Sequence, residues 1–162
     1  MKKTSFALLF VPFLVLTGCV NKVKKVNIVS VNHNTAEYVT SSEEFEFDAW
    51  YNNSNKLYCI NIEIKNNTNK NKTFEFSDTY YKDELTGVKF YLTLFPANYN
   101  ERYPNAHACY MSPNKIVVDK ESNDTIGGGS YLYAPEEVHY ITFHTVVNNF
   151  EFTVSGLERL TL

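Results

Sequence analysis

Residues 57–76, "LYCINIEIKNNTNKNKTFEF", decide the fold. Every second residue of the first half is apolar: Tyr58, Ile60, Ile62 and Ile64. A period of two between apolar and polar residues is typical of a β-strand that buries one face. Phe74 and Phe76 repeat the period after the Asn-rich segment 66–71, whose residues favour turns. The stretch therefore predicts two antiparallel strands joined by a hairpin loop.

The same alternation recurs on both sides of this hairpin. Further strands are predicted at residues 43–50, 88–95, 115–119, 139–147 and 150–154. One short helix is expected at residues 77–87, with Asp78 as the N-cap and Gly87 as the stop. Residues 122–130, "SNDTIGGGS", are expected to form a flexible loop. Seven to nine short strands in one domain predict an all-β fold, an antiparallel β-sandwich of two packed sheets.

The hairpin and the following "VKFYLTL" at residues 88–94 resemble the central hairpins of immunoglobulin-like domains found in many small bacterial lipoproteins. Those domains combine a long apolar strand, a polar turn and a returning aromatic strand. The resemblance implies an immunoglobulin-like sandwich but no particular activity. The cysteine–tryptophan–cysteine order of antibody domains is absent, because Trp50 precedes both Cys59 and Cys109.

The N-terminal residues indicate a secretory signal peptide. Lys2 and Lys3 precede the apolar run 6–16, which is shorter than the about 20 residues that span a membrane. Residues 16–19, "LTGC", resemble the lipobox of bacterial lipoproteins. The resemblance implies that the sulfur of Cys19 receives a diacylglycerol whose acyl chains, such as palmitate, enter the bilayer. It also implies that cleavage before this cysteine removes the signal peptide.

These features divide the chain into a signal peptide at 1–18, a lipidated tether at 19–25 and a β-sandwich domain at 26–162. Two or more acyl chains hold a protein stably in a lipid bilayer. If the host is a diderm bacterium, the expected location is the outer membrane, because Val20 is not the Asp that retains lipoproteins in the inner membrane. In a monoderm it is the outer face of the cell membrane. Cleavage changes the formal charge from −3 to −5, which argues against nucleic acid as a partner.

The two cysteines beyond the lipobox are Cys59 and Cys109. Envelope proteins mature in an oxidising compartment, so these cysteines are predicted to form a disulfide. The alternative is two free thiols. The face of the predicted strand does not decide between them, because Cys59 lies opposite the apolar Ile60 and Ile62.

The sequence contains no motif that predicts catalysis or a metal site, so we expect neither an enzyme nor a cofactor. His139 and His144 are five residues apart and point to opposite faces of one predicted strand. The glycines of "IGGGS" at residues 126–130 lack the Lys of a phosphate-binding loop. Asn123 heads "NDT" within "ESNDT", which resembles the acidic glycosylation sequon of some bacteria; an ordinary polar loop is the alternative.

If the protein has a recognition surface, we expect it in residues 96–113, the longest segment without a usable period. The segment contains four residues of the types that dominate binding hot spots: Tyr99, Arg102, Tyr103 and Tyr110. The competing interpretation is that these tyrosines cap one end of the sandwich.

The expected function is a non-enzymatic binding or structural module of the cell envelope, with an envelope protein or a glycan as partner. The alternative is a small envelope hydrolase or hydrolase inhibitor whose site lies in loops. The presence of titratable side chains that converge in a concave pocket would distinguish the two.

Overall fold

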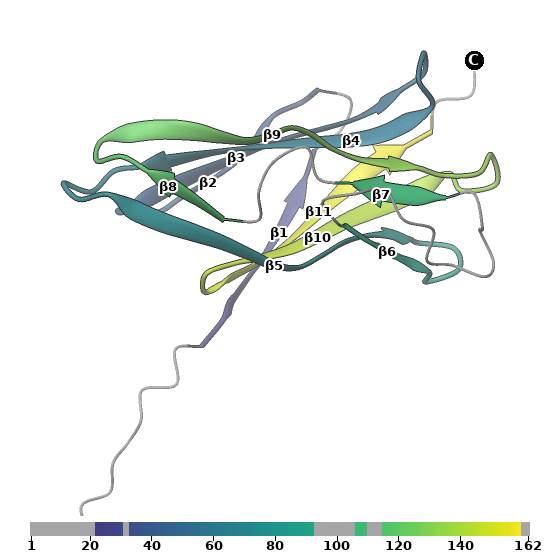
Figure 1. Ribbon diagram of the computed structural model, residues 1–162. Helices are drawn as coiled ribbons and strands as arrows, with labels where there is room; N and C mark the ends of the chain where they lie inside the picture. The colour runs from purple at the N-terminus through teal and green to yellow at the C-terminus, as the bar shows by residue number, and fades with distance from the viewer. Residues whose placement is uncertain (1–21, 31–32, 93–105, 110–114, 160–162) are drawn as a thin grey trace, which may run out of the picture.

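The computed structural model describes residues 22–30, 33–92, 106–109 and 115–159. Eleven β-strands in two sheets are the regular elements of this part of the chain (Figure 1). It includes no helix long and apolar enough to cross a bilayer. The all-β prediction is therefore confirmed, with more strands than the seven to nine expected.

The two sheets have different strand orders. Sheet A runs β1-β11-β10-β5-β6, and β8 pairs with β5 beside this path. Its strands are β1 (Lys24–Val29), β5 (Lys72–Asp83), β6 (Lys89–Tyr91), β8 (Lys115–Val118), β10 (Tyr140–Val147) and β11 (Phe150–Glu158). Sheet B runs β2-β3-β4-β9-β7. Its strands are β2 (Ala36–Val39), β3 (Glu43–Asn52), β4 (Leu57–Asn66), β7 (His107–Cys109) and β9 (Ser122–Tyr133).

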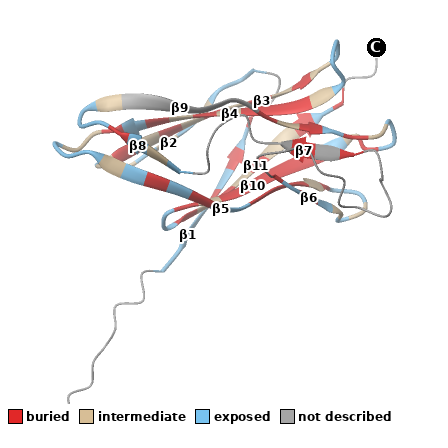
Figure 2. Ribbon diagram, viewed as in Figure 1, coloured by how far each residue is buried: buried red, intermediate tan, exposed pale blue. Residues whose placement is uncertain are grey.

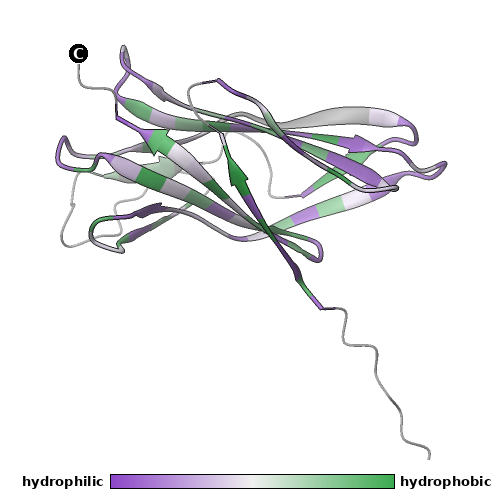
Figure 3. Cartoon of the chain, turned by 180° about the vertical axis from the view of Figure 1, so that it is seen from behind, coloured by the Kyte–Doolittle hydropathy of each residue, from purple (hydrophilic) through white to green (hydrophobic). Residues whose placement is uncertain are grey.

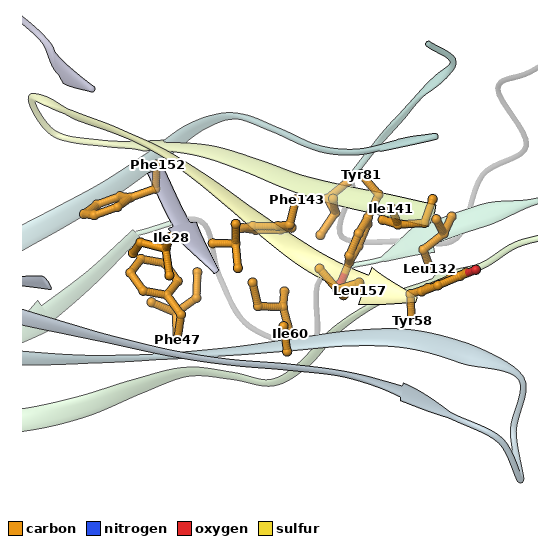
Figure 4. Close-up of a cluster of buried hydrophobic side chains, with 14 of the residues drawn as sticks. Ile28, Phe47, Tyr58, Ile60, Tyr81, Leu132, Ile141, Phe143, Phe152 and Leu157 are labelled. Atoms are coloured by element: carbon orange, nitrogen blue, oxygen red, sulfur yellow. The ribbon is translucent and has the colours of Figure 1, made fainter. Parts of the chain in front are cut away.

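Alternate residues of the facing strands form one core between the two sheets (Figures 2 and 4). The largest fully buried side chains are Tyr58, Tyr81, Phe45, Phe47, Phe74, Phe143, Phe152, Ile60, Ile64, Leu132 and Ile141. The ring centroid of Phe152 in β11 lies 4.9 Å from those of both Phe45 and Phe47 in β3. Full burial of one large apolar side chain stabilises the fold by about 1.5–3 kcal/mol. The aromatic side chains therefore hold the sheets together as a β-sandwich.

The described chain enters the sandwich through β1, which pairs in parallel with β11 (Figure 3). Lys24 and Lys25, expected in the tether, belong to this strand. The backbone N–H of Lys24 donates to the carbonyl of Asn149 at 2.8 Å, so β1 begins beside the β10–β11 hairpin. At the other end of the sandwich, an ion pair of 3.3 Å between Lys56 and Glu136 joins the β3–β4 and β9–β10 loops.

The prediction of a helix at residues 77–87 is wrong. The strand β5 continues to Asp83, and a turn follows it. Asp78 has a φ of 46°, and the register between β5 and β10 shifts beside it. Such a β-bulge inserts one extra residue into one strand. Phe76 and Tyr81 therefore both face the core although they are five residues apart, an odd spacing. The period of two is lost across the bulge.

The prediction of a flexible loop at residues 122–130 is also wrong, because the segment lies in β9. This strand pairs with β4 along its length, from Ser122 opposite Asn66 to Tyr133 opposite Leu57. The glycines at 127–129 carry no side chains that could show an alternation. Within the segment 96–113, β7 pairs with β9, whereas residues 96–105 and 110–113 lie outside the described residues.

Candidate functional site

Four outward-facing side chains line up across sheet A. The register pairs Tyr91 of β6 with Tyr80 of β5, Tyr80 with His144 of β10, and His144 with Thr153 of β11. They point away from the core because their neighbours along each strand, such as Phe143, are buried in it. The strand pairing thus brings residues from distant parts of the sequence into one row.

Tyr80 and His144 form the rigid middle of this row. Their rings stack with centroids 4.6 Å apart and an interplanar angle of 20°. The Lys89 Nζ lies 4.0 Å from the centroid of the Tyr80 ring, a cation–π distance. Tyr91 meets the same ring edge to face at 5.3 Å. Each of the two central side chains is only 8% exposed although it points outward, so these contacts restrict both rings.

A hollow lies beside the stacked rings on the outer face of sheet A. Its lining residues are Tyr80, Lys82, Glu84, Thr142, His144, Glu151 and Thr153. Thr142 and Thr153 are shorter than the residues around them. The charged residues of the rim are paired: Lys82 with Glu84 at 3.3 Å, and Glu151 with Lys25 at 3.5 Å. The hollow is therefore polar and carries charges of both signs in balance.

Two lining side chains keep hydrogen-bonding atoms unused although they are more than nine-tenths buried. Thr142 is 9% exposed, and within the described part of the chain its hydroxyl makes no hydrogen bond. His144 has its Nε2 3.5 Å from the Asp78 Oδ2, and its Nδ1 makes no hydrogen bond to any described residue. Neither atom is among the buried side-chain atoms without a partner, so both reach the solvent of the hollow. These atoms are consequently accessible to a ligand there.

The protonation state of His144 follows from its surroundings. Burial lowers the pKa of His144 below its usual value, and the nearby carboxylate of Asp78 opposes this shift only in part. The imidazole is therefore neutral at pH 7, with one ring nitrogen as a donor and the other as an acceptor.

Two β-bulges flank the hollow. One is at Asp78 in β5, and the other is in β11 near Gly156, where the register against β10 shifts. Both residues have positive φ, 46° and 95°. β-Bulges re-aim side chains and are frequent beside functional sites, and Asp in the left-handed region costs more than Gly. The bulges therefore help to place the side chains that line the hollow.

The outer face of sheet B carries a second charged feature, a row of carboxylates. Glu46 of β3 is opposite Glu37 of β2 on one side and Glu63 of β4 on the other. Burial, with Glu63 next in importance, raises the pKa of Glu46. Like charges opposite one another destabilise a sheet.

Across the described residues, no group of three His, Cys, Asp or Glu side chains is placed to hold a metal ion.

Most site residues predicted from the sequence lie where the structure makes no statement. Cys19 and the residues of the expected recognition segment, Tyr99, Arg102, Tyr103 and Tyr110, lie outside the described residues. Asn123 is in β9, where its backbone pairs with Lys65, and its side chain lies outside the described part. The flexible loop expected around this sequon is therefore replaced by a paired strand.

The disulfide expected between Cys59 and Cys109 is not formed in the structure, in which Cys59 is a free, buried cysteine. Tyr131 of β9 pairs with Cys59 on one side and with Cys109 on the other. Two strand spacings separate the Cα atoms of the cysteines by about 9.6 Å, whereas a disulfide needs about 4.4–6.8 Å. Burial raises the pKa of the Cys59 thiol to about 11, so this thiol is protonated and unreactive.

The sequence did not indicate the hollow. The period of two assigns Thr142, His144 and Thr153 to outward faces, but which of them are neighbours depends on strand pairing and on two bulges. A histidine on the polar side of a half-buried strand was the one available signal. Comparisons of the chain with protein-family models, with curated proteins and with solved structures found no match.

Proposed function

We propose that this protein is a lipid-anchored lipoprotein of the bacterial cell envelope and that its immunoglobulin-like sandwich is a non-enzymatic binding module. The hollow on sheet A carries the binding role, because Thr142 and His144 are buried there with unused hydrogen-bonding atoms. The lipobox at residues 16–19 supports the anchor. The parallel pairing of the first strand with the last supports the immunoglobulin-like classification.

The tether would hold the hollow close to the membrane. Five residues, 19–23, precede β1 and span at most about 18 Å when fully extended. In sheet A, Asn27 of β1 pairs with Thr153 of the hollow. A ligand of this module would therefore be a component of the envelope near the membrane surface.

The anchor is tested by replacing its acceptor. Cys19→Ser removes the sulfur that would carry the diacylglycerol. We expect this variant to lose incorporation of radiolabelled palmitate and to leave the detergent phase or accumulate as an uncut precursor. Unchanged partitioning into the detergent phase would contradict the proposal.

The binding role is tested by photo-crosslinking in intact cells. A photoreactive amino acid in place of Lys82 would lie on the rim of the hollow, whereas the same group in place of Glu75 would lie elsewhere on β5. We expect an envelope component to be captured from the first position and not from the second. Absence of any adduct, or equal adducts from both positions, would overturn the binding role of the hollow.

The alternative, an envelope hydrolase or inhibitor, needs titratable groups that converge in a concave site. The hollow does contain titratable groups, His144, Lys82, Glu84 and Glu151, but among the described residues neither glutamate pairs with His144, and each is paired with a lysine. The Asp78 carboxylate, which approaches His144, is 55% exposed and does not line the hollow. The geometry therefore favours binding. Turnover of an envelope substrate that disappears in His144→Gln would instead support the hydrolase.

A further inference from the structure

We infer that the hollow on sheet A binds a neutral saccharide. The inference names a ligand class for the proposed binding module and rests on that function. It is carried by three properties of the lining residues: their balanced charge, their unused hydrogen-bonding atoms and their arrangement over three adjacent strands.

The balanced charge offers no net attraction to a strongly charged ligand. Lys82 is neutralised by Glu84 and Glu151 by Lys25, while His144 is uncharged at pH 7. A phosphate or another anion would meet carboxylates on the same rim as the ammonium groups. A cation would meet the ammonium groups in the same way. A neutral ligand avoids both repulsions.

The unused atoms match hydroxyl groups in particular. The Thr142 and Thr153 hydroxyls can each donate and accept a hydrogen bond, and the Nδ1 of His144 accepts one when the ring proton is on the Nε2 beside Asp78. No described residue accepts from or donates to either hydroxyl. Sugar hydroxyls also donate and accept at once, so one ligand of this type can use all three side chains. Water occupies such atoms equally well in the absence of a ligand.

The dimensions agree with a small saccharide. Except for Glu84, which follows β5, the lining residues lie on β5, β10 and β11, and two strand spacings measure about 10 Å. Tyr80 and His144 form a flat wall at one side, held by their stacking contact at 4.6 Å. Because this wall is preformed, a ligand would not have to order it on binding.

Saturation-transfer NMR on the full-length protein tests the inference. The protein is held in a detergent without a sugar headgroup, and the probes are diacetylchitobiose, maltose, cellobiose and lactose at millimolar concentration. Tri-alanine and methyl phosphate, whose methyl protons can receive saturation, serve as probes of other chemistry. We expect saturation transfer to at least one disaccharide, and none to methyl phosphate or to tri-alanine.

Three variants locate the binding site. Thr142→Val keeps the shape of the side chain and removes the hydroxyl, so it should weaken disaccharide binding about fivefold. Thr153→Arg should fill the hollow and abolish binding. Thr73→Val changes an exposed threonine of β5 outside the hollow and should leave binding unchanged. Equal thermal melting of the variants would exclude unfolding as the cause.

Two results would overturn the inference: no transfer to any of the four disaccharides, or transfer that Thr142→Val and Thr153→Arg leave unchanged. Binding of tri-alanine alone would also overturn it. In each case the photo-crosslinking experiment at position 82 decides whether the proposed binding function still holds. If position 82 captures no envelope component, the proposed binding function is wrong as well.

Discussion

Asn66, the last residue of β4, fastens the β4–β5 loop to the end of β8. Its side chain is fully buried, and its Nδ2 donates to the carbonyls of Lys70 at 2.8 Å, Asp119 at 3.0 Å and Val118 at 3.1 Å. Its Oδ1 accepts from the backbone N–H and the hydroxyl of Thr68 at 3.0 and 2.7 Å. Since an amide has two N–H groups, one of them is shared between carbonyls. We therefore predict that Asn66→Ala strongly destabilises the protein.

The magnitude follows from the groups that would lose a partner. A buried polar group without a partner costs about 1–3 kcal/mol, and a bond that water can replace costs less. Only the bond to Val118 is fully buried, so about 1.5 kcal/mol there and smaller losses at the other four bonds give about 3 kcal/mol. For a domain of this size, that loss lowers the melting temperature by about 10 °C.

A second substitution at the same position should change the stability of the protein by an amount that depends on pH. Asn66→Asp replaces the donor with an oxygen that faces three carbonyls, so the new carboxyl should have a raised pKa in the folded state. Its stabilising contribution is present at low pH and is lost as the pH rises through that raised pKa. The variant should therefore be least stable at neutral pH and should recover on acidification.

Urea unfolding followed by the fluorescence of the single Trp measures both variants. Asn69→Ala is the matched control, because Asn69 is an exposed residue of the same loop and its side chain makes no hydrogen bond or ion pair with a described residue. The control should stay within about 0.5 kcal/mol of the unchanged protein. If Asn66→Ala did the same, the proposed role of these hydrogen bonds would be refuted.

Three further predictions concern other parts of the sandwich. Burial and three nearby carboxylates raise the pKa of Glu46, so stability falls as the pH rises through that value; Glu46→Gln should remove this part of the dependence of the urea midpoint on pH. Cys59, buried and with a pKa raised to about 11, should react with a thiol reagent only after unfolding, and full protection after unfolding would disprove the free thiol. Gly156→Ala should cost about 1–2 kcal/mol in thermal melts because of the positive φ of 95°, and an unchanged melting temperature would contradict the bulge geometry.

The alternation of apolar and polar residues predicted the central strands because each of them buries one face. In β3, Phe45 and Phe47 point into the core, and in β4 Ile60 and Ile64 do so from the neighbouring strand. The short β1 and β2 were not predicted, since β1 depends on a parallel partner at the far end of the sequence. β9 was missed because its glycines show no period, although β4 supplies its hydrogen bonds.

The candidate site could not be predicted for a different reason. Thr142, His144 and Thr153 are ordinary outward-facing strand residues when each strand is considered alone. The site exists only once the register places His144 between Tyr80 and Thr153. Neither a motif nor a spacing in the sequence encodes that register, because β5 lies far from the β10–β11 hairpin in the chain. The burial of His144 by the stacked ring of Tyr80 is likewise a property of the assembled sheet.

The places where the sequence pattern fails coincide with the flanks of the hollow. At Asp78 an extra residue reversed the alternation of β5, and the segment was interpreted as a helix; at Gly156 an extra residue does the same to β11. Where a natural protein departs from a local sequence pattern, the departure is often at a functional or strained position. In a sheet with a regular period, the outer face would present evenly spaced side chains. Two bulges on either side of β10 instead give an uneven face, and the unused polar atoms of Thr142 and His144 lie between them. The failed helix prediction and the candidate binding site therefore share one structural cause.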